Sequence, residues 1–323
     1  MTATVRIATR ASELARWQAE HVASLLGGVD PTLGIEMVPV STEGDRRTDV
    51  PLSSIGGKGV FSKEIQRAVL DGRADVAVHS AKDLPALTPD GLVIAAVPPR
   101  ADPRDALVGS DIGGLAAAVA AGTDAVVATG SARRRVQLAD LVPGLHFAEL
   151  RGNMGTRIER ARDFDAVVVA AAALERLGLT EHISQVLPAD VLVPQVGQGA
   201  LAVECRAGDD ELRGLLRGIE DARSRLAVDA ERGFLAELGG DCSLPAGAHC
   251  ILAPVADSHG HGTGDGPQRP VSGAMVIEGI LGETVEPGTR TIRDSLRADI
   301  GSVDPEALGR DLAVGLRTLL EDP

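Results

Sequence analysis

Cys242 is a residue type that could carry a covalent bond. It lies in the segment GDCSLPAG (240–247), directly after a helical pattern that Gly239 and Gly240 end, so we expect it in a loop beyond a helix C-terminus. The partial negative charge at that end of a helix does not favour a thiolate, so a strongly activated hydrolase-type nucleophile is not predicted there. Two hypotheses remain: a point of one-time covalent attachment, and a small buried hydrophobic residue near a turn.

The segment VHSAKDLPA (78–86) could supply acid–base chemistry. It places Ser80, Lys82 and Asp83 at the carboxyl end of an apolar run, and Pro85 prevents simple continuation of a strand. Polar groups at the carboxyl end of a strand in an α/β sheet face a cleft. A carboxylate there could stabilise a developing cation and relay a proton to or from a pyrrole-type nitrogen. The simpler alternative is a surface ion pair between neighbouring residues.

Two segments combine arginines with hydroxyl or amide groups where a strand pattern gives way to a helix pattern: TGSARRRVQL (129–138) and LRGNMGTRIER (150–160). Exposed backbone N–H groups at such helix starts bind anions, and guanidinium forks add bidentate recognition of carboxylates. A single cluster of this kind is commonly a solvated face. Two clusters, together with Arg10 and Lys58, favour an anionic small molecule as ligand.

The glycine-rich segment GGKGVFSKE (56–64) resembles a phosphate cradle only superficially. Its lysine lies between the glycines, and the spacing GxxxxGK[ST] of a phosphate-binding loop is absent. We interpret the segment as a mobile lid that brings Lys58 and Phe61 to an anion. A plain flexible turn is the alternative.

Composition bounds the class of protein. The net charge is −14, which argues against nucleic acid or an anionic membrane as the main partner. Screening acts over about 8 Å at physiological salt, so distant carboxylates do not cancel a local arginine cluster. No run approaches the roughly 18 apolar residues of a membrane span. The N-terminus leads directly into a strand pattern without a signal peptide, so we expect a cytoplasmic protein.

Cysteine and histidine usage does not indicate a metal centre. Cys205, Cys242 and Cys250 are too few and too scattered for a disulfide framework or a CxxC metal site. Each is therefore a buried apolar residue or a reactive thiol. The segment HGHGTGDGPQ (258–267) is rich in glycine and histidine, and we expect a flexible surface loop there rather than a metal site.

Short apolar runs must position these groups. They are continuous rather than alternating, and segments with helical spacing lie between several of them, which indicates α/β sheets that are mostly parallel and covered on both faces. The runs are VRIAT (5–9), IEMVPV (35–40), DVAVHS (75–80), LVIAAVP (92–98), AVVAT (125–129), HFAEL (146–150), DAVVVAAAA (165–173) and LAVEC (201–205).

An internal echo predicts two similar domains. The run IAT leads through Arg10 to Ser12 and a helix pattern, and the run VVAT leads through Gly130 to Ser131 and another. Polar, proline-containing stretches at 98–105 and around Pro194 mark two crossings between these domains, so the chain returns.

We therefore expect three domains. From about residue 223 a long amphipathic pattern, weaker alternating runs and a final helix near 305–320 indicate a small α+β unit. The expected domains are residues 1–101 with 201–219, residues 106–194, and residues 223–323.

Taken together, these segments resemble the porphobilinogen deaminase family. The match runs in order from residue 5 to about residue 250, and the order makes it more specific than any single segment. The segments are IATRASELARWQ (7–18), GGKGVFSKE, VHSAKDLP, ADPRDA (101–106), GSARRR (130–135), LRGNMGTR (150–157), VPQVGQGAL (193–201) and ERGFLAELGGDCSLP (231–245).

This resemblance implies a fold and an activity. The fold is two domains like those of periplasmic binding proteins around a cleft, plus a small α+β domain whose loop presents a cysteine. The activity is the head-to-tail condensation of four porphobilinogen units with loss of ammonia, on a dipyrromethane primer joined through a thioether to Cys242, followed by hydrolytic release of hydroxymethylbilane for haem biosynthesis. A monomer is expected.

The resemblance also implies roles for individual residues. Asp83 would be the catalytic carboxylate that stabilises the azafulvene-like cation left when ammonia departs. Residues expected to hold the primer beside Cys242 and Asp83 are Ser80, Lys82, Thr129, Ser131, Arg133, Arg134, Arg151 and Gly152. Residues expected to hold the substrate are Arg10, Ser12, Lys58, Phe61, Arg151, Arg157 and Gln198, the last of them near the hinge. No metal is expected.

Two other functions stay open at this point. A two-lobed protein could capture an anion without catalysis, with Cys242 merely structural, although the lack of an export signal counts against it. A thiol-dependent acyl transferase or hydrolase would need a base near Cys242. His249 is close in sequence, but no pattern places it in contact with the thiol.

Overall fold

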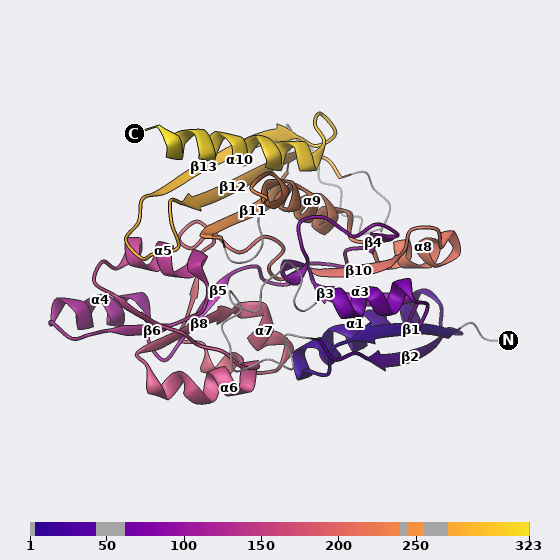
Figure 1. The fold of residues 1–323 in the computed structure, drawn as a ribbon, viewed down its shortest axis with the longest axis horizontal. Coiled ribbons are helices and arrows are strands. Elements are labelled where there is room, and N and C mark those ends of the chain that lie inside the picture. The colour runs from indigo at the N-terminus through magenta and orange to yellow at the C-terminus, as the bar shows by residue number, and fades with distance from the viewer. Residues whose placement is uncertain (1–3, 43–61, 240–243, 255–270, 323) are drawn as a thin grey trace.

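The computed structural model describes residues 4–42, 62–239, 244–254 and 271–322 (Figure 1). Its first sheet has five strands in the order β2-β1-β3-β10-β4. Strand β10 runs antiparallel to both of its neighbours, and β1 runs parallel to β2 and β3. The strands are β1 (Thr4–Thr9), β2 (Gly34–Pro39), β3 (Val76–Ser80), β4 (Leu92–Ala96) and β10 (Leu201–Arg206), and the helices α1 (Glu13–Val29), α3 (Lys63–Leu70) and α8 (Asp210–Leu216) pack on this sheet.

The second sheet repeats the order of the first. It reads β7-β6-β8-β5-β9, and β5 takes the antiparallel place that β10 has in the first sheet. Its strands are β5 (Asp105–Val108), β6 (Val126–Ala128), β7 (His146–Ala148), β8 (Ala166–Ala170) and β9 (Gln185–Leu187), and its helices are α4 (Ile112–Ala120), α5 (Ala132–Leu141), α6 (Met154–Glu159) and α7 (Ala171–Arg176).

The predicted internal echo is confirmed by this topology. Strand β1 occupies the same place in its sheet as β6 does in the other, and each leads into a helix, α1 after Ser12 and α5 after Ser131. In each sheet four of the five strands point the same way, as expected for mostly parallel sheets. The long continuous runs become strands because both faces of each sheet are covered by helices and other buried chain.

The third unit is an antiparallel sheet of three strands with two helices on one face. Helix α9 contacts β11, and α10 contacts β12 and β13. The elements are α9 (Ala222–Glu237), β11 (Ala246–Ala253), β12 (Ala274–Gly282), β13 (Thr291–Asp299) and α10 (Pro305–Glu321), drawn from orange to yellow in Figure 1. The predicted class, two α/β domains around a cleft with a small α+β unit, is thus confirmed.

None of the helices among the described residues combines the length and the hydropathy that crossing a membrane would require.

Candidate active site

The turn after β3 carries the predicted acid. Ala81–Asp83 form a single 3₁₀ turn, in which Asp83 is exposed and Lys82 half-buried. The turn is fixed from behind by the return crossing, because Ala81 N–H donates to the carbonyl of Ala200 at 3.0 Å. Gly197 has φ +71°, and a Cβ there would come within 3.0 Å of the Lys82 nitrogen. Only glycine lets the crossing approach so closely.

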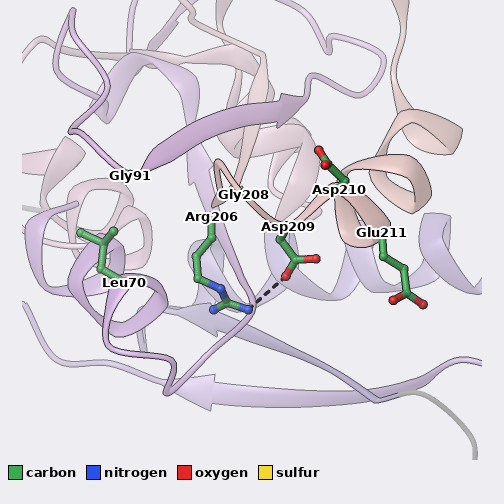
Figure 2. Close-up of a pocket in the computed structure, with 7 residues that line it drawn as sticks. All are labelled: Leu70, Gly91, Arg206, Gly208, Asp209, Asp210 and Glu211. Atoms are coloured by element: carbon green, nitrogen blue, oxygen red, sulfur yellow. Dashed lines mark hydrogen bonds and ion pairs between the residues drawn. The ribbon is translucent and has the colours of Figure 1, made fainter.

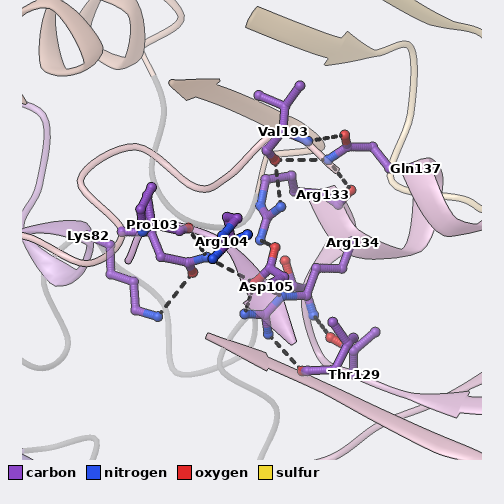
Figure 3. Close-up of polar contacts among 12 residues, drawn as sticks. Lys82, Pro103, Arg104, Asp105, Thr129, Arg133, Arg134, Gln137 and Val193 are labelled. Carbon is purple, nitrogen blue, oxygen red and sulfur yellow. Dashed lines mark hydrogen bonds and ion pairs between the residues drawn. The ribbon is translucent and has the colours of Figure 1, made fainter. Parts of the chain in front are cut away.

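The start of α5 supplies two predicted arginines, and both are buried against Asp105. Arg133 Nη2 lies 2.8 Å from one Asp105 oxygen, and Arg134 Nη2 lies 2.6 Å from the other (Figure 3). Arg133 also donates to the carbonyl of Val193 at 2.6 Å, and Arg134 to that of Val168 at 3.0 Å. Burial alone would raise the pKa of the Asp105 carboxyl, but the two guanidinium groups hold that pKa well below its usual range.

Gln198 joins the two halves of the site. Its amide nitrogen donates to Asp105 at 2.9 Å and to the carbonyl of Pro103 at 2.8 Å. Its amide oxygen accepts from Lys82 Nζ at 3.3 Å. Since Gln198 is fully buried, one side chain links the turn of the first sheet to the arginines of the second. Gln198 thus lies on the return crossing and contacts the first one, and its expected place near a hinge stays a prediction.

The site is rich in cations relative to anions. Burial and the charge of Arg134 lower the pKa of Lys82 to about 8, although Asp83 and Asp105 act in the opposite direction. Burial, Arg134 and Arg151 also lower the pKa of Arg157, against the opposing charge of Asp83. Asp83 and Arg134 thus act electrostatically on both Lys82 and Arg157, and Arg151 acts on Arg157. The binding roles of these residues stay predictions.

Other predicted residues have clear local roles. Ser12 caps α1 by accepting from Ala15 N–H at 3.4 Å, and Arg10 lies between β1 and this cap. Thr129 is buried, and its hydroxyl accepts from Ser131 N–H at 3.2 Å. Ser80 is buried at the end of β3.

Gly152 has a backbone that favours glycine. Its φ is +115°, and its carbonyl accepts from Arg157 Nε at 3.0 Å.

Adjacent parallel strands end at one edge of a sheet. The residues after β1 and β3 therefore lie at one edge of the first sheet, and those after β6 lie at the matching edge of the second sheet.

Three predicted residues lie outside the described residues: Lys58, Phe61 and Cys242. The Gly/His segment 258–267 lies outside them as well. The other two cysteines are described, and both are buried. Burial raises the pKa of the Cys205 thiol to about 11 and that of Cys250 to about 12, so neither is suited to form a thiolate near neutral pH.

Sequence reasoning gave no role to Asp105 or to Gln137. Asp105 lies in the segment ADPRDA. The signal that could have identified it is an acidic residue directly before the apolar residues ALV (106–108). A charge at the start of a buried strand needs partners, and Arg133 and Arg134 follow at the start of α5. Gln137 lies four residues after Arg133 on one helix and offered no such signal.

A surface hollow of about 590 Å³ lies elsewhere, at the start of α8 (Figure 2). Its lining includes Asp209, Asp210 and Glu211, and the guanidinium of Arg206 is already paired with Asp209 and Asp75. An acidic hollow repels carboxylates, so this is not where an anionic ligand would bind. Within the described ranges, no group of three His, Cys, Asp or Glu side chains is arranged to hold a metal ion.

Comparison with known families agrees with this geometry. Residues 5–214 match the family model described as "Porphobilinogen deaminase, dipyromethane cofactor binding domain". The chain is similar to the porphobilinogen deaminase of Syntrophus aciditrophicus, with 48% identity over 98% of both chains. It is also similar to that of Nitratidesulfovibrio vulgaris, with 41% identity over 96% of this chain and 92% of the relative.

A third relative matches over a shorter range. The porphobilinogen deaminase of Syntrophotalea carbinolica is 47% identical over 77% of this chain and 79% of its own length. Among solved structures, the effector-binding domain of BenM with benzoate covers 67% of this chain and 90% of its own, with a TM-score of 0.39 and 13% identity, which is too low to add to the argument. The family match spans both α/β units and the described residues of the candidate site: this chain belongs to the porphobilinogen deaminase family.

Proposed function

We propose that this chain is a transferase of tetrapyrrole synthesis that condenses four porphobilinogen units on a covalently held dipyrromethane primer. Family membership supports the activity. The observation from the structure that carries the proposal is a cluster of cations next to one exposed acid: Asp83 acts on Lys82 and Arg157, Arg134 acts on both, and Arg151 acts on Arg157. Each pyrrole ring of the substrate brings two carboxylates, which suit such a cluster of cations.

The residues present fit an acidic primer. Arg133 Nε is buried and has no hydrogen-bond acceptor among the described residues, and the neighbouring cations depress one another's pKa values. Lys82, Arg134 and Arg151 would hold carboxylates of the primer, whose terminal ring supplies the carbon to be extended. The primer would also be contacted by Thr129, Ser131 and Gly152. The incoming substrate is proposed to be held by Arg10, Ser12, Lys58, Phe61 and Arg157.

Asp83 is the proposed catalytic residue. When ammonia leaves the aminomethyl group of porphobilinogen, positive charge develops on that ring and needs a fixed anion nearby. Asp83 is exposed at the mouth of the turn, and its charge already acts on Lys82 and Arg157. The same carboxylate can move a pyrrole N–H proton during ring coupling. Gln198 keeps Lys82 beside it.

Cys242 is the proposed attachment residue. The buried, high-pKa thiols of Cys205 and Cys250 are poorly suited to covalent attachment, which leaves Cys242 among the cysteines of the sequence. Measurement of the intact mass of the purified protein tests this. We expect an excess that corresponds to two linked pyrrole rings, and we expect the excess to be absent from Cys242→Ser. A fully active protein of unmodified mass would rule out the attached primer.

The role of Asp83 has its own test. Asp83→Asn should keep the fold but lower turnover of porphobilinogen at least about a hundredfold, because the developing cation loses its counter-charge. Asp90→Asn, which changes another exposed acid of the same unit, is the matched control and should turn over substrate normally. Wild-type protein that binds porphobilinogen without releasing ammonia would instead support an anion-binding protein.

A further inference from the structure

Gln137 fastens helix α5 to the return crossing. Its amide oxygen accepts from the N–H of Val193 at 2.8 Å, and its amide nitrogen donates to the carbonyl of the same residue at 3.1 Å (Figure 3). The nitrogen also donates to the carbonyl of Arg133 at 3.2 Å. The side chain is buried, so these bonds are shielded from water. The Gln137 amide thus pairs with the Val193 backbone as a residue of a neighbouring strand would. On helix α5, Gln137 lies one turn after Arg133.

A side chain from the third unit closes this arrangement. Arg293 of β13 donates through Nη2 to the Gln137 amide oxygen at 2.8 Å and to the carbonyl of Val191 at 2.7 Å. Its Nη1 donates to the carbonyl of Asp190. One guanidinium therefore holds both the helix and the crossing, and charge-assisted hydrogen bonds of this kind are stronger than neutral ones.

The opposite edge of the same sheet also touches α5. Strand β11 lies at one edge of the sheet and β13 at the other. A Cβ on Gly247 of β11 would lie 2.8 Å from Arg133 Cδ and 2.6 Å from the carbonyl of Pro194. The third unit therefore meets the arginine helix from both edges of its sheet, and on the β13 side Thr291 also donates to Asp140 of α5. Strand β11 begins at Ala246, shortly after Cys242 in the sequence.

We propose that Arg293 and Gln137 are positioning residues that set helix α5, with Arg133 and Arg134, against the strand that follows Cys242. Neither side chain is placed against the substrate or the primer, so they act through α5 and Val193. The inference rests on the proposed function, since it assigns the arginines to carboxylates of a group attached at Cys242. Its consequence is that assembly of the primer, more than turnover afterwards, depends on Arg293.

Arg293→Met tests the proposal, and Arg297→Met is the matched control. Arg297 lies on the same strand and is exposed, and its side chain makes no hydrogen bond or ion pair with the described residues. Protein produced without porphobilinogen would be incubated with it, and the covalent mass increase followed over time. We expect Arg293→Met to load about tenfold more slowly than wild type, with kcat of the loaded protein within about twofold, while Arg297→Met matches wild type.

A double-mutant cycle separates positioning from general loss of stability. If Arg293 acts through Gln137, the loading rate of Arg293→Met with Gln137→Met should be about that of the slower single variant, because residues of one network are not additive. Thermal unfolding of each variant checks the fold. Arg293→Lys keeps a donor to part of the network and should load at an intermediate rate, which keeps the test usable if Arg293→Met does not fold.

Two outcomes would overturn the inference: loading of Arg293→Met at the wild-type rate, or losses in the two variants that multiply in the double variant. A different outcome bears on the proposed function instead. If wild-type protein gains no mass and releases no ammonia from porphobilinogen, the proposed activity is wrong, whatever the Arg293 variants show.

Discussion

Lys82 is held by a neutral partner among charged neighbours. It donates to the amide oxygen of Gln198 at 3.3 Å, while Arg134 and Arg157 lower its pKa and Asp83 and Asp105 raise it. Burial is the largest cause of the net decrease to about 8. The lysine is therefore charged at neutral pH and loses its proton in mildly alkaline solution. A carboxylate of the primer would be attracted only to the charged form.

This gives a prediction for the pH dependence of catalysis. As pH rises through about 8, Lys82 becomes neutral, so kcat/KM for porphobilinogen should fall by about tenfold by pH 9.5. Lys82→Arg keeps its charge throughout this range and should show a flat profile. Lys82→Met should be flat as well, but at the low value. An alkaline decrease that is the same in all three proteins would assign it to another group.

At the scale of elements, helices α9 and α10 cross at two glycines. A Cβ on Gly309 of α10 would lie 1.8 Å from the carbonyl oxygen of Ala230, and one on Gly233 of α9 would lie 2.1 Å from that of Glu306. The two backbones therefore touch. This close crossing lets Phe234 and Leu312 fill the core beneath the helices, over the three-stranded sheet.

Gly309→Ala should separate this helix pair. We expect a loss of about 3 kcal/mol in the free energy of unfolding, because the added methyl group meets a backbone carbonyl that cannot move aside. Gly315→Ala, on the same helix with nothing within 4 Å of the new Cβ, should instead gain up to about 1 kcal/mol. Urea unfolding of both variants measures this, and equal effects would show that the crossing is not tight.

The elements that the sequence predicted are those with long apolar runs or clear helix patterns. Runs such as DVAVHS became β3 because a strand buried on both faces needs apolar residues at most of its positions. Strands β6 and β7, with 3 residues each, were predicted from the runs AVVAT and HFAEL. Strands β5 and β9, with 4 and 3 residues, were not predicted, because no run of that length marks them. Their pairing is decided by the neighbouring strands, which a local pattern does not record.

The candidate site was predictable to a similar degree. Strand ends and helix starts indicated Lys82, Asp83 and the arginines, because such positions share one rim of a sheet. The groups that hold these residues in place were not predictable. Asp105 and Gln137 act through burial and through contacts with residues far away in the sequence. The number of hydrogen bonds that a side chain makes across the fold does not appear in its local sequence.

At the scale of the whole molecule, Glu231 of α9 ties the three units together. Its buried carboxylate accepts from Arg100 Nη1 at 2.6 Å on the first crossing and from Gly197 N–H at 2.7 Å on the return crossing. It also accepts from Cys250 N–H at 2.9 Å in the third sheet. One carboxylate thus stabilises both crossings and the unit that follows them.

The charge of Glu231 makes this junction sensitive to acid. Burial would raise the pKa of its carboxyl, but Arg100 and His249 lower that pKa to about 2, below the ordinary value of 4.5. A group with a lowered folded-state pKa stabilises the fold fully above its unfolded value and loses that contribution as pH falls toward the folded value. The stabilisation is about 3 kcal/mol and should decline between about pH 5 and pH 2.

Glu231→Gln should therefore be less stable than wild type by about 3 to 5 kcal/mol at pH 7, because Arg100 is left buried without its counter-charge. The difference should shrink as pH is lowered toward 3, since the carboxyl of the unfolded wild-type protein takes up a proton in this range while the folded one stays mostly ionised. Denaturant unfolding at several pH values measures both quantities. Glu283→Gln, a change at an exposed carboxylate of the third unit, should run parallel to wild type. A gap between Glu231→Gln and wild type that stays constant down to pH 3 would mean that the ionised carboxylate is not what holds the crossings.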